Sequence, residues 1–198
     1  MHPIDRLSLA LIALVTLVSL GLQVVATGIE NPDFGLPQVI WRMLRFFTIL
    51  TSLLVGLGCA RMVWRGRFDG PVWLGGLTLW SAITGVVYHA LFARDLAGVA
   101  WWADLGLHTL VPVAVFAMWL LRMPKDGLGL RATLLWLLWP LIYVGYALVR
   151  GSFEGVYPYF FVNPDQIGWL GVLRWSGVLC GAFFVAGLGL VGVPRLRR

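Results

Sequence analysis

Long apolar runs dominate this chain and restrict its fold more than any other feature. Of its 198 residues, 60% are hydrophobic and only 12% are charged. A water-soluble domain of this length could not bury so much apolar surface. The runs continue over roughly 20 residues, which is the length that a helix needs to cross a bilayer, and they lack the alternation of outer-membrane strands. We therefore predict an all-α integral membrane protein.

The runs predict six transmembrane helices in one bundle, which form a single transmembrane domain over residues 1–198. The predicted spans are Leu7–Val25, Trp41–Val63, Val72–Ala93, Trp101–Leu121, Ala132–Val149 and Gly168–Val193. The first span, which follows Arg6 and ends near Ala26, also has features of a cleavable signal peptide. We favour a retained helix, because six spans give a consistent distribution of charge.

The charges divide unequally between the two sides of the membrane that six spans define. One side holds both chain ends and most of the basic residues: Arg6, Arg61, Arg65, Arg67, Arg122, Lys125, Arg131, Arg195, Arg197 and Arg198. Because basic residues are retained on the cytoplasmic side, both termini are expected there, in a multi-pass protein of the plasma membrane. The net charge of +6 then reflects this orientation, and we expect no nucleic-acid partner.

Polar side chains inside the predicted spans are candidates for function, because charge is costly in lipid. Counted from the outer boundary, Thr48 lies seven residues into the second span and His108 seven residues into the fourth. With a rise of about 1.5 Å per residue, the two side chains share a depth. Other polar side chains of the same outer half, which could support them, are Asp104, Arg45, Arg174 and His89. The sequence therefore predicts one polar site in the outer half of the bilayer.

Pro112 follows His108 by four residues and should distort the fourth span at this site. Proline has no N–H group to bond the carbonyl of residue 108, and its ring pushes that carbonyl away. We expect a kink beside His108 and a carbonyl group released from the helix.

This set of residues could attack an ester. A threonine hydroxyl is a weak nucleophile until a base removes its proton, and a neutral imidazole is the usual base. Asp104, at helical spacing from His108, could orient the imidazole, and Arg45 or Arg174 could stabilise an oxyanion. Each residue also has a structural interpretation. The Thr48 hydroxyl could donate to the backbone carbonyl four residues earlier. The negative charge of Asp104 could interact favourably with the dipole at the N-terminus of its helix.

Three short motifs, in this order along the spans, resemble a known family. They are Arg45-Phe46-Phe47-Thr48, then His108-Thr109 followed by Pro112, then Tyr157-Pro158-Tyr159-Phe160. The chain resembles the androgen-induced and androgen-dependent TFPI-regulating multipass membrane hydrolases, as a bacterial relative. The resemblance implies a metal-independent transmembrane threonine hydrolase that cleaves fatty acid esters of hydroxy fatty acids, with Thr48 as nucleophile and His108 as the catalytic histidine. It implies no cofactor, and a lipid or fatty-acyl ester as substrate. The stretch after His108 differs in detail from the animal pattern.

Two other functions remain open from the sequence. His89 and His108 could be axial ligands of one haem, although membrane cytochromes often carry further histidines and this chain has three in all. The chain could also bind lipid without turning it over.

Overall fold

The computed structural model describes residues 1–196, with side chains described to residue 192, and this part of the chain is helical without strands. Six helical stretches are long and apolar enough to cross a membrane. The sequence-based prediction of an all-α fold with six such helices is therefore confirmed. The stretches are Pro3–Glu30, Phe47–Arg65, Pro71–Leu91, Gly98–Leu121, Leu130–Glu154 and Pro164–Gly192.

The chain forms two compact units, Met1–Pro124 and Lys125–Arg198. The first contains α1 (Pro3–Glu30), α2 (Leu36–Met43), α3 (Phe47–Arg65), α4 (Pro71–Leu91), α5 (Gly98–Leu105), the π-helix η1 (Gly106–Leu110) and α6 (Val111–Leu121). The second contains α7 (Leu130–Trp136), α8 (Leu138–Glu154), the 3₁₀-helix η2 (Phe160–Val162) and α9 (Pro164–Leu196). The expectation that both belong to a single transmembrane domain stays a prediction.

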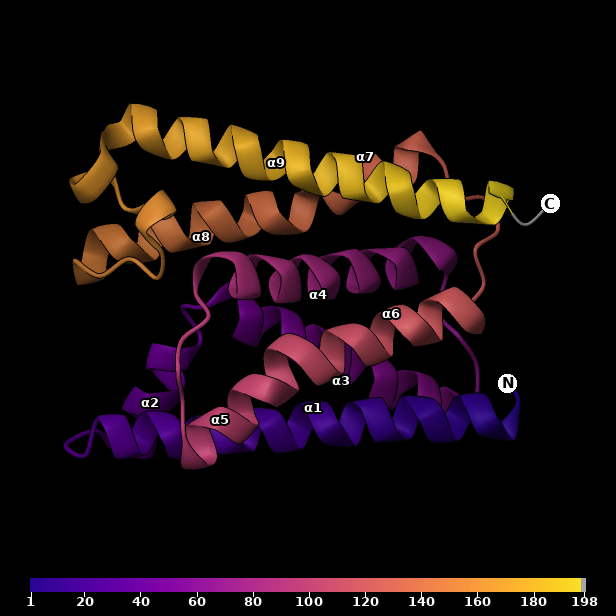
Figure 1. Ribbon diagram of the computed structural model, residues 1–198, viewed down its shortest axis with the longest axis horizontal. Coiled ribbons are helices and arrows are strands. Elements are labelled where there is room, and N and C mark those ends of the chain that lie inside the picture. Colours follow the sequence, from indigo (N-terminus) through magenta and orange to yellow (C-terminus); the bar gives the residue numbers. More distant parts are fainter. Residues whose placement is uncertain (197–198) are drawn as a thin grey trace. The chain divides into compact units, whose positions relative to one another are not determined.

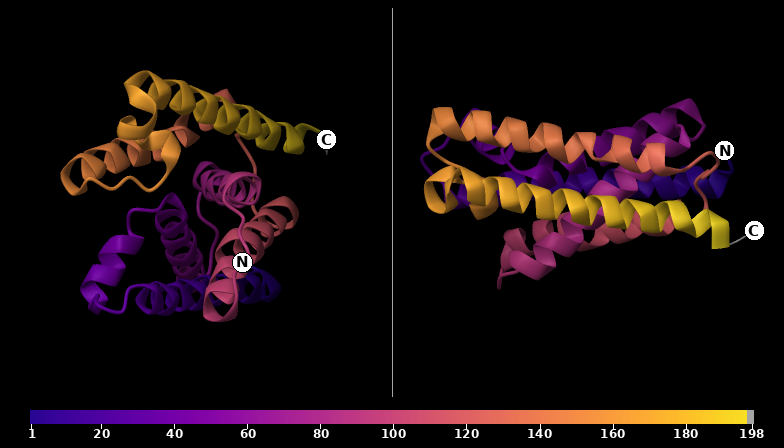
Figure 2. Two further views of the ribbon diagram at one scale, coloured as in Figure 1. Left: turned by 60° about the vertical axis from the view of Figure 1, so that its left-hand side comes forward. Right: turned by 90° about the horizontal axis from the view of Figure 1, so that it is seen from above.

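In the first unit, α1 packs along α3 and α5, and α4 packs along α6 (Figures 1 and 2). A buried apolar cluster joins four of its elements: Leu20 of α1, Val39 and Met43 of α2, Ile49 of α3 and Leu107 of η1. Ile49 follows Thr48 in the sequence, and Leu107 precedes His108. Neighbouring side chains of a helix point about 100° apart. Because Ile49 and Leu107 are buried in this cluster, Thr48 and His108 point away from it.

The second predicted span, Trp41–Val63, begins later than the sequence indicated. Trp41 belongs to the short helix α2, and α3 begins at Phe47. Between them Phe46 is extended, with φ −90° and ψ 135°. No glycine or proline stands at this break, so the apolar run gave no sign of it. Two separate helices therefore replace the predicted continuous one.

Most helices extend beyond the predicted spans. The first, α1, covers Pro3–Glu30, and the fifth span continues through α8 to Glu154. Arg150 and Glu154, expected in an outer loop, are therefore helical. Arg150 is buried, and its side chain donates to Glu154 Oε1 and to the Tyr146 hydroxyl, each at 2.8 Å. The sixth span is interrupted at Gly168, where φ is 68°.

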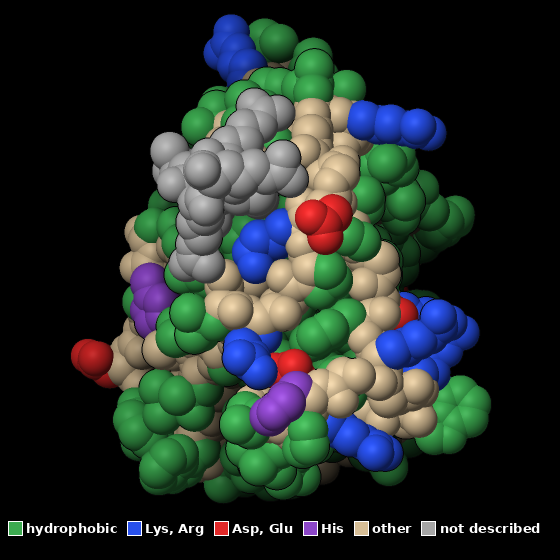
Figure 3. All heavy atoms as spheres, turned by 90° about the vertical axis from the view of Figure 1, so that its right-hand side faces the viewer, with side chains coloured by type: hydrophobic (Ala, Val, Ile, Leu, Met, Phe, Trp, Pro, Cys, Tyr) green, Lys and Arg blue, Asp and Glu red, His purple; other side chains and the backbone are tan. Residues whose placement is uncertain are grey.

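One end of the first unit gathers basic side chains. The N-terminus of α1, the C-terminus of α3 and the C-terminus of α6 all lie at this end (Figure 1). The Arg122 Nε donates to Asp5 Oδ1 at 2.6 Å, and an Arg61 guanidinium nitrogen lies 2.6 Å from Asp69 Oδ2. Figure 3 views this end, where Lys and Arg side chains stand beside acidic ones.

Candidate functional site

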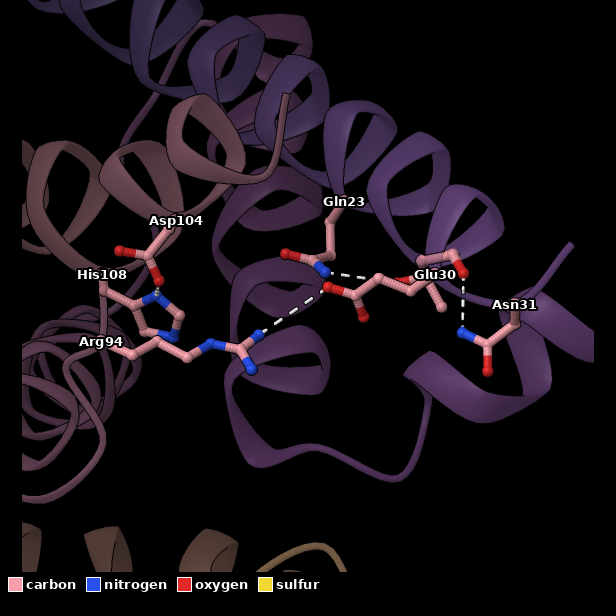
Figure 4. Close-up of polar contacts among 7 residues, drawn as sticks. Gln23, Glu30, Asn31, Arg94, Asp104 and His108 are labelled. Carbon is pink, nitrogen blue, oxygen red and sulfur yellow. Dashed lines mark hydrogen bonds and ion pairs between the residues drawn. The ribbon is translucent and has the colours of Figure 1, made fainter. Parts of the chain in front are cut away.

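Three polar side chains of the first unit form a hydrogen-bonded row at the end of the unit opposite the N-terminus. His108 Nδ1 lies 3.0 Å from Asp104 Oδ1, and His108 Nε2 lies 3.3 Å from Thr48 Oγ1. Figure 4 shows the imidazole turned toward the carboxylate. The side chains of His108 and Asp104 are only 12% and 20% exposed. The structure therefore brings together Thr48 and His108, which the sequence paired, and places Asp104, the suggested orienting residue, beside His108.

His108 lies in a π-helical segment rather than at a simple kink. In η1 the backbone widens, and the N–H of Val111 donates to the carbonyl of Gly106, five residues earlier. Such segments are rare, and they often occur at functional sites. Pro112 is the second residue of α6, so its missing N–H and its ring lie where the helix changes from π to α geometry. The predicted distortion at Pro112 is present, in the form of this segment.

Two glycines allow neighbouring helices to approach η1 closely. A Cβ atom on Gly85 of α4 would lie 2.7 Å from the His108 carbonyl oxygen. A Cβ atom on Gly106 would overlap the side chain of Ser19 of α1. A larger residue at Gly85 would force α4 and the His108 backbone apart, and one at Gly106 would displace the side chain of Ser19, so the close packing around η1 depends on both glycines.

Thr48 is the second residue of α3, and this helix begins directly after the extended Phe46. The first amide groups of a helix have no carbonyl of their own helix to bond, and they carry partial positive charge. The Thr48 hydroxyl therefore stands at the positive end of the α3 dipole, next to the His108 imidazole. This environment differs from the mid-helix position that the predicted span implied.

Tyr88, which the sequence analysis did not single out, completes the surroundings of His108. Its ring stacks on the imidazole with centroids 3.7 Å apart and planes 12° from parallel. Its hydroxyl lies near enough to Asp104 for the two groups to interact. One available signal was its position beside His89 near the outer end of the third span.

The remaining predicted residues lie around this row or outside the first unit. His89 Nε2 lies 3.0 Å from Thr109 Oγ1, so it joins the next residue of η1 rather than Thr48. Arg45 is half-buried in the turn before α3, three residues from Thr48. Arg94, in the connection after α4, lies 3.9 Å from Glu30 (Figure 4). Arg174 belongs to α9 in the second unit.

The geometry does not favour the haem hypothesis. Both ring nitrogens of His108 face side-chain oxygens, and His89 Nε2 faces another. An axial role would require breaking these contacts. Among the described residues, no three or more His, Cys, Asp or Glu side chains gather as a set that could hold a metal ion.

Comparisons of the chain with protein-family models, curated proteins and solved structures find no match. The family resemblance of the three motifs therefore stays a prediction. The first two motifs meet at the row of Asp104, His108 and Thr48, and the third lies at η2 of the second unit.

Proposed function

We propose that this protein is an integral membrane lipid-ester hydrolase with Thr48 as nucleophile and His108 as general base. The observation that carries the proposal is the row in which Asp104 contacts His108 Nδ1 and His108 Nε2 contacts Thr48 Oγ1. A carboxylate, an imidazole and a hydroxyl in this order are the parts of a nucleophilic hydrolase, and they recur on unrelated folds.

The reaction follows from the tautomer that Asp104 selects. With its proton on Nδ1 and directed at the carboxylate, His108 presents the Nε2 lone pair to the Thr48 hydroxyl. As Oγ1 attacks the ester carbonyl, Nε2 takes its proton, and Asp104 stabilises the imidazolium that forms. Nε2 then protonates the leaving alkoxide, and the alcohol departs from an acyl-threonine. A water molecule, deprotonated by Nε2, attacks this ester, and the acid leaves as Thr48 recovers its proton.

The Oγ1–Nε2 distance of 3.3 Å is long for a hydrogen bond. Catalytic hydrogen bonds are often long without substrate and shorten in the complex that reacts. The negative oxygen of the tetrahedral intermediate needs donors that are already in place. The partial positive charge at the start of α3 favours this oxygen, and Arg45 stands in the adjoining turn. We therefore assign oxyanion stabilisation to the start of α3, with Arg45 as a second candidate.

The substrate class follows from the surroundings of the row. The site lies on helices apolar enough to cross a membrane, so it receives molecules that partition into lipid. The motif resemblance implies fatty acid esters of hydroxy fatty acids. The orientation is part of the proposal: the basic end of the first unit faces the cytoplasm, and the site lies in the outer half of the plasma membrane.

Purified protein in detergent tests the proposal with fatty-acyl esters and a fluorophosphonate probe. Thr48→Ala and His108→Ala are each expected to lower hydrolysis by at least about 1,000-fold, because the residues act as a unit. The probe should label the wild type and not Thr48→Ala.

Thr78→Val is the matched control, since its buried hydroxyl bonds only the Leu74 carbonyl of its own helix, at 2.8 Å. It should keep wild-type activity. If folded Thr48→Ala and His108→Ala retain hydrolysis, the mechanism is wrong. If the wild type binds fatty-acyl esters and never cleaves them, the protein is a lipid-binding protein instead.

A further inference from the structure

Tyr88 touches two members of the catalytic row from one position on α4. The stacked ring covers a face of the His108 imidazole at 3.7 Å between centroids. The Tyr88 hydroxyl lies near enough to the Asp104 carboxylate to interact with it. The same ring lies edge-on to His89, with centroids 5.3 Å apart.

The row needs such a support because its own hydrogen bonds leave two rotations open. The terminal torsion of histidine is broad, and the 3.3 Å contact between Nε2 and Thr48 Oγ1 is too long to fix the plane of the ring firmly. The carboxylate of Asp104 can also exchange its two oxygens. A flat ring packed at 12° to the imidazole plane restricts the first rotation, and the nearby hydroxyl of the same residue restricts the second.

We propose that Tyr88 is a positioning residue, which holds the His108 imidazole with Nδ1 toward Asp104 and Nε2 toward Thr48. This inference rests on the proposed function for its catalytic meaning. The arrangement of His108 itself is a separate property, which can be measured without substrate. The aromatic face also attracts a cation, so it favours the imidazolium that forms during attack.

A space-filling role is the plain alternative, and two substitutions separate it from positioning. Tyr88→Phe keeps the stacked ring and removes the hydroxyl. Tyr88→Leu keeps an apolar side chain and removes both the stacked ring and the hydroxyl. If Tyr88 only fills space, the two variants behave alike. If it positions the ring, Phe preserves most of the function and Leu does not.

The decisive measurement is the tautomer of His108, followed by NMR of protein labelled with ¹⁵N-histidine in detergent. Because the chain has three histidines, His2→Gln and His89→Gln assign the signals. Wild type and Tyr88→Phe should show one neutral tautomer with the proton on Nδ1. Tyr88→Leu should show a mixture of both. A single tautomer in a folded Tyr88→Leu would overturn the proposal.

Kinetics give the second readout. Tyr88→Leu should lower kcat about 100-fold with KM little changed, as expected when a reacting group is misplaced by about 1 Å. Tyr88→Phe should lower it less than tenfold, the range of one lost polar interaction. The controls are Phe116→Leu on α6 and Thr84→Val on α4, whose hydroxyl bonds the Trp80 carbonyl. If Tyr88→Leu does not fold, Tyr88→Met takes its place, since it also removes the ring and the hydroxyl; a single tautomer and wild-type kcat in folded Tyr88→Met overturn the proposal.

The two proposals can fail separately. A mixed tautomer in Tyr88→Leu combined with full activity in Thr48→Ala would retain the positioning role and reject the threonine hydrolase. A single tautomer in Tyr88→Leu combined with loss of activity in Thr48→Ala would retain the hydrolase and reject the positioning role of Tyr88.

Discussion

A methyl group on Gly85 would lie 2.7 Å from the carbonyl oxygen of His108. This contact joins α4 to the π-helical segment at the residue that carries the proposed base. Real Cβ atoms do not approach a carbonyl oxygen so closely, so the two helices would have to separate. The close approach of α4 to the residue that carries the proposed base therefore requires glycine at position 85.

We expect Gly85→Ala to lower kcat about 100-fold, because the displaced backbone moves His108 away from Thr48. Gly21→Ala on α1 is the matched control, since nothing lies within 4 Å of the added methyl group. Ester hydrolysis, together with thermal unfolding in detergent, measures both variants. Equal activity of Gly85→Ala and the wild type would show that the close approach has no catalytic consequence.

Replacing Asp104 by asparagine tests which tautomer the row uses. The amide can donate to Nδ1, so the proton of His108 would shift to Nε2, where it faces Thr48 and cannot accept. Hydrolysis and probe labelling should both fall by about 1,000-fold or more, as for the equivalent carboxylate of serine hydrolases. Asp95→Asn, in the exposed connection before α5, should leave both unchanged. Labelling of Asp104→Asn at the wild-type rate would remove the aspartate from the mechanism.

The ion pair between Asp5 and Arg122 ties the start of α1 to the end of α6. The Asp5 side chain is 9% exposed and that of Arg122 is 45% exposed, so solvent weakens the pair only in part. We expect Arg122→Met to destabilise the protein by about 1–2 kcal/mol, since it leaves a nearly buried carboxylate without this partner.

Arg65→Met is the control for this pair, because Arg65 lies 3.9 Å from Asp69 and is 43% exposed. It should change stability by less than about 0.5 kcal/mol. Adding Asp5→Asn to Arg122→Met should recover part of the loss in thermal unfolding. No recovery would indicate that packing, and not charge, joins the two ends.

The proposed orientation predicts which residues a membrane-impermeant maleimide can reach in intact cells. The two free cysteines, Cys59 and Cys180, are first replaced by alanine. In that background Asp33→Cys, in the turn between α1 and α2, should react from outside. Arg67→Cys, in the turn between α3 and α4, should react only after the cells are opened. The reverse pattern would invert the topology.

The sequence predicted the helices well, because a span of lipid imposes one requirement on every residue of a run. It also paired Thr48 with His108, although the depth count assumed a helix that continues through Leu44–Phe46. The structure nevertheless places the two side chains 3.3 Å apart. Thr48 lies in the first turn of α3, where the count expected the interior of a longer helix. Their catalytic roles stay predictions.

The finer geometry depends on contacts between distant segments, which periodicity does not contain. Tyr88 stacks on His108 from another helix, and its position beside His89 indicated its depth but not this contact. Asp104 stood at helical spacing from His108, but solvent-facing aspartates have the same spacing. The division into two units also has no counterpart in the composition, since apolar runs continue on both sides of residue 124.

The π-helical segment changes which residues of the fourth span lie on the same face of the helix. It accommodates one residue more than an α-helix would, so a helical wheel drawn from Trp101 to Leu121 is wrong by about 100° on one side of it. Deleting a single residue from Gly106–Leu110 would restore a regular register and rotate Asp104 and the rest of α5 around the axis relative to α6. After that rotation, the span could not keep Asp104 beside His108 and also keep the same side chains facing lipid.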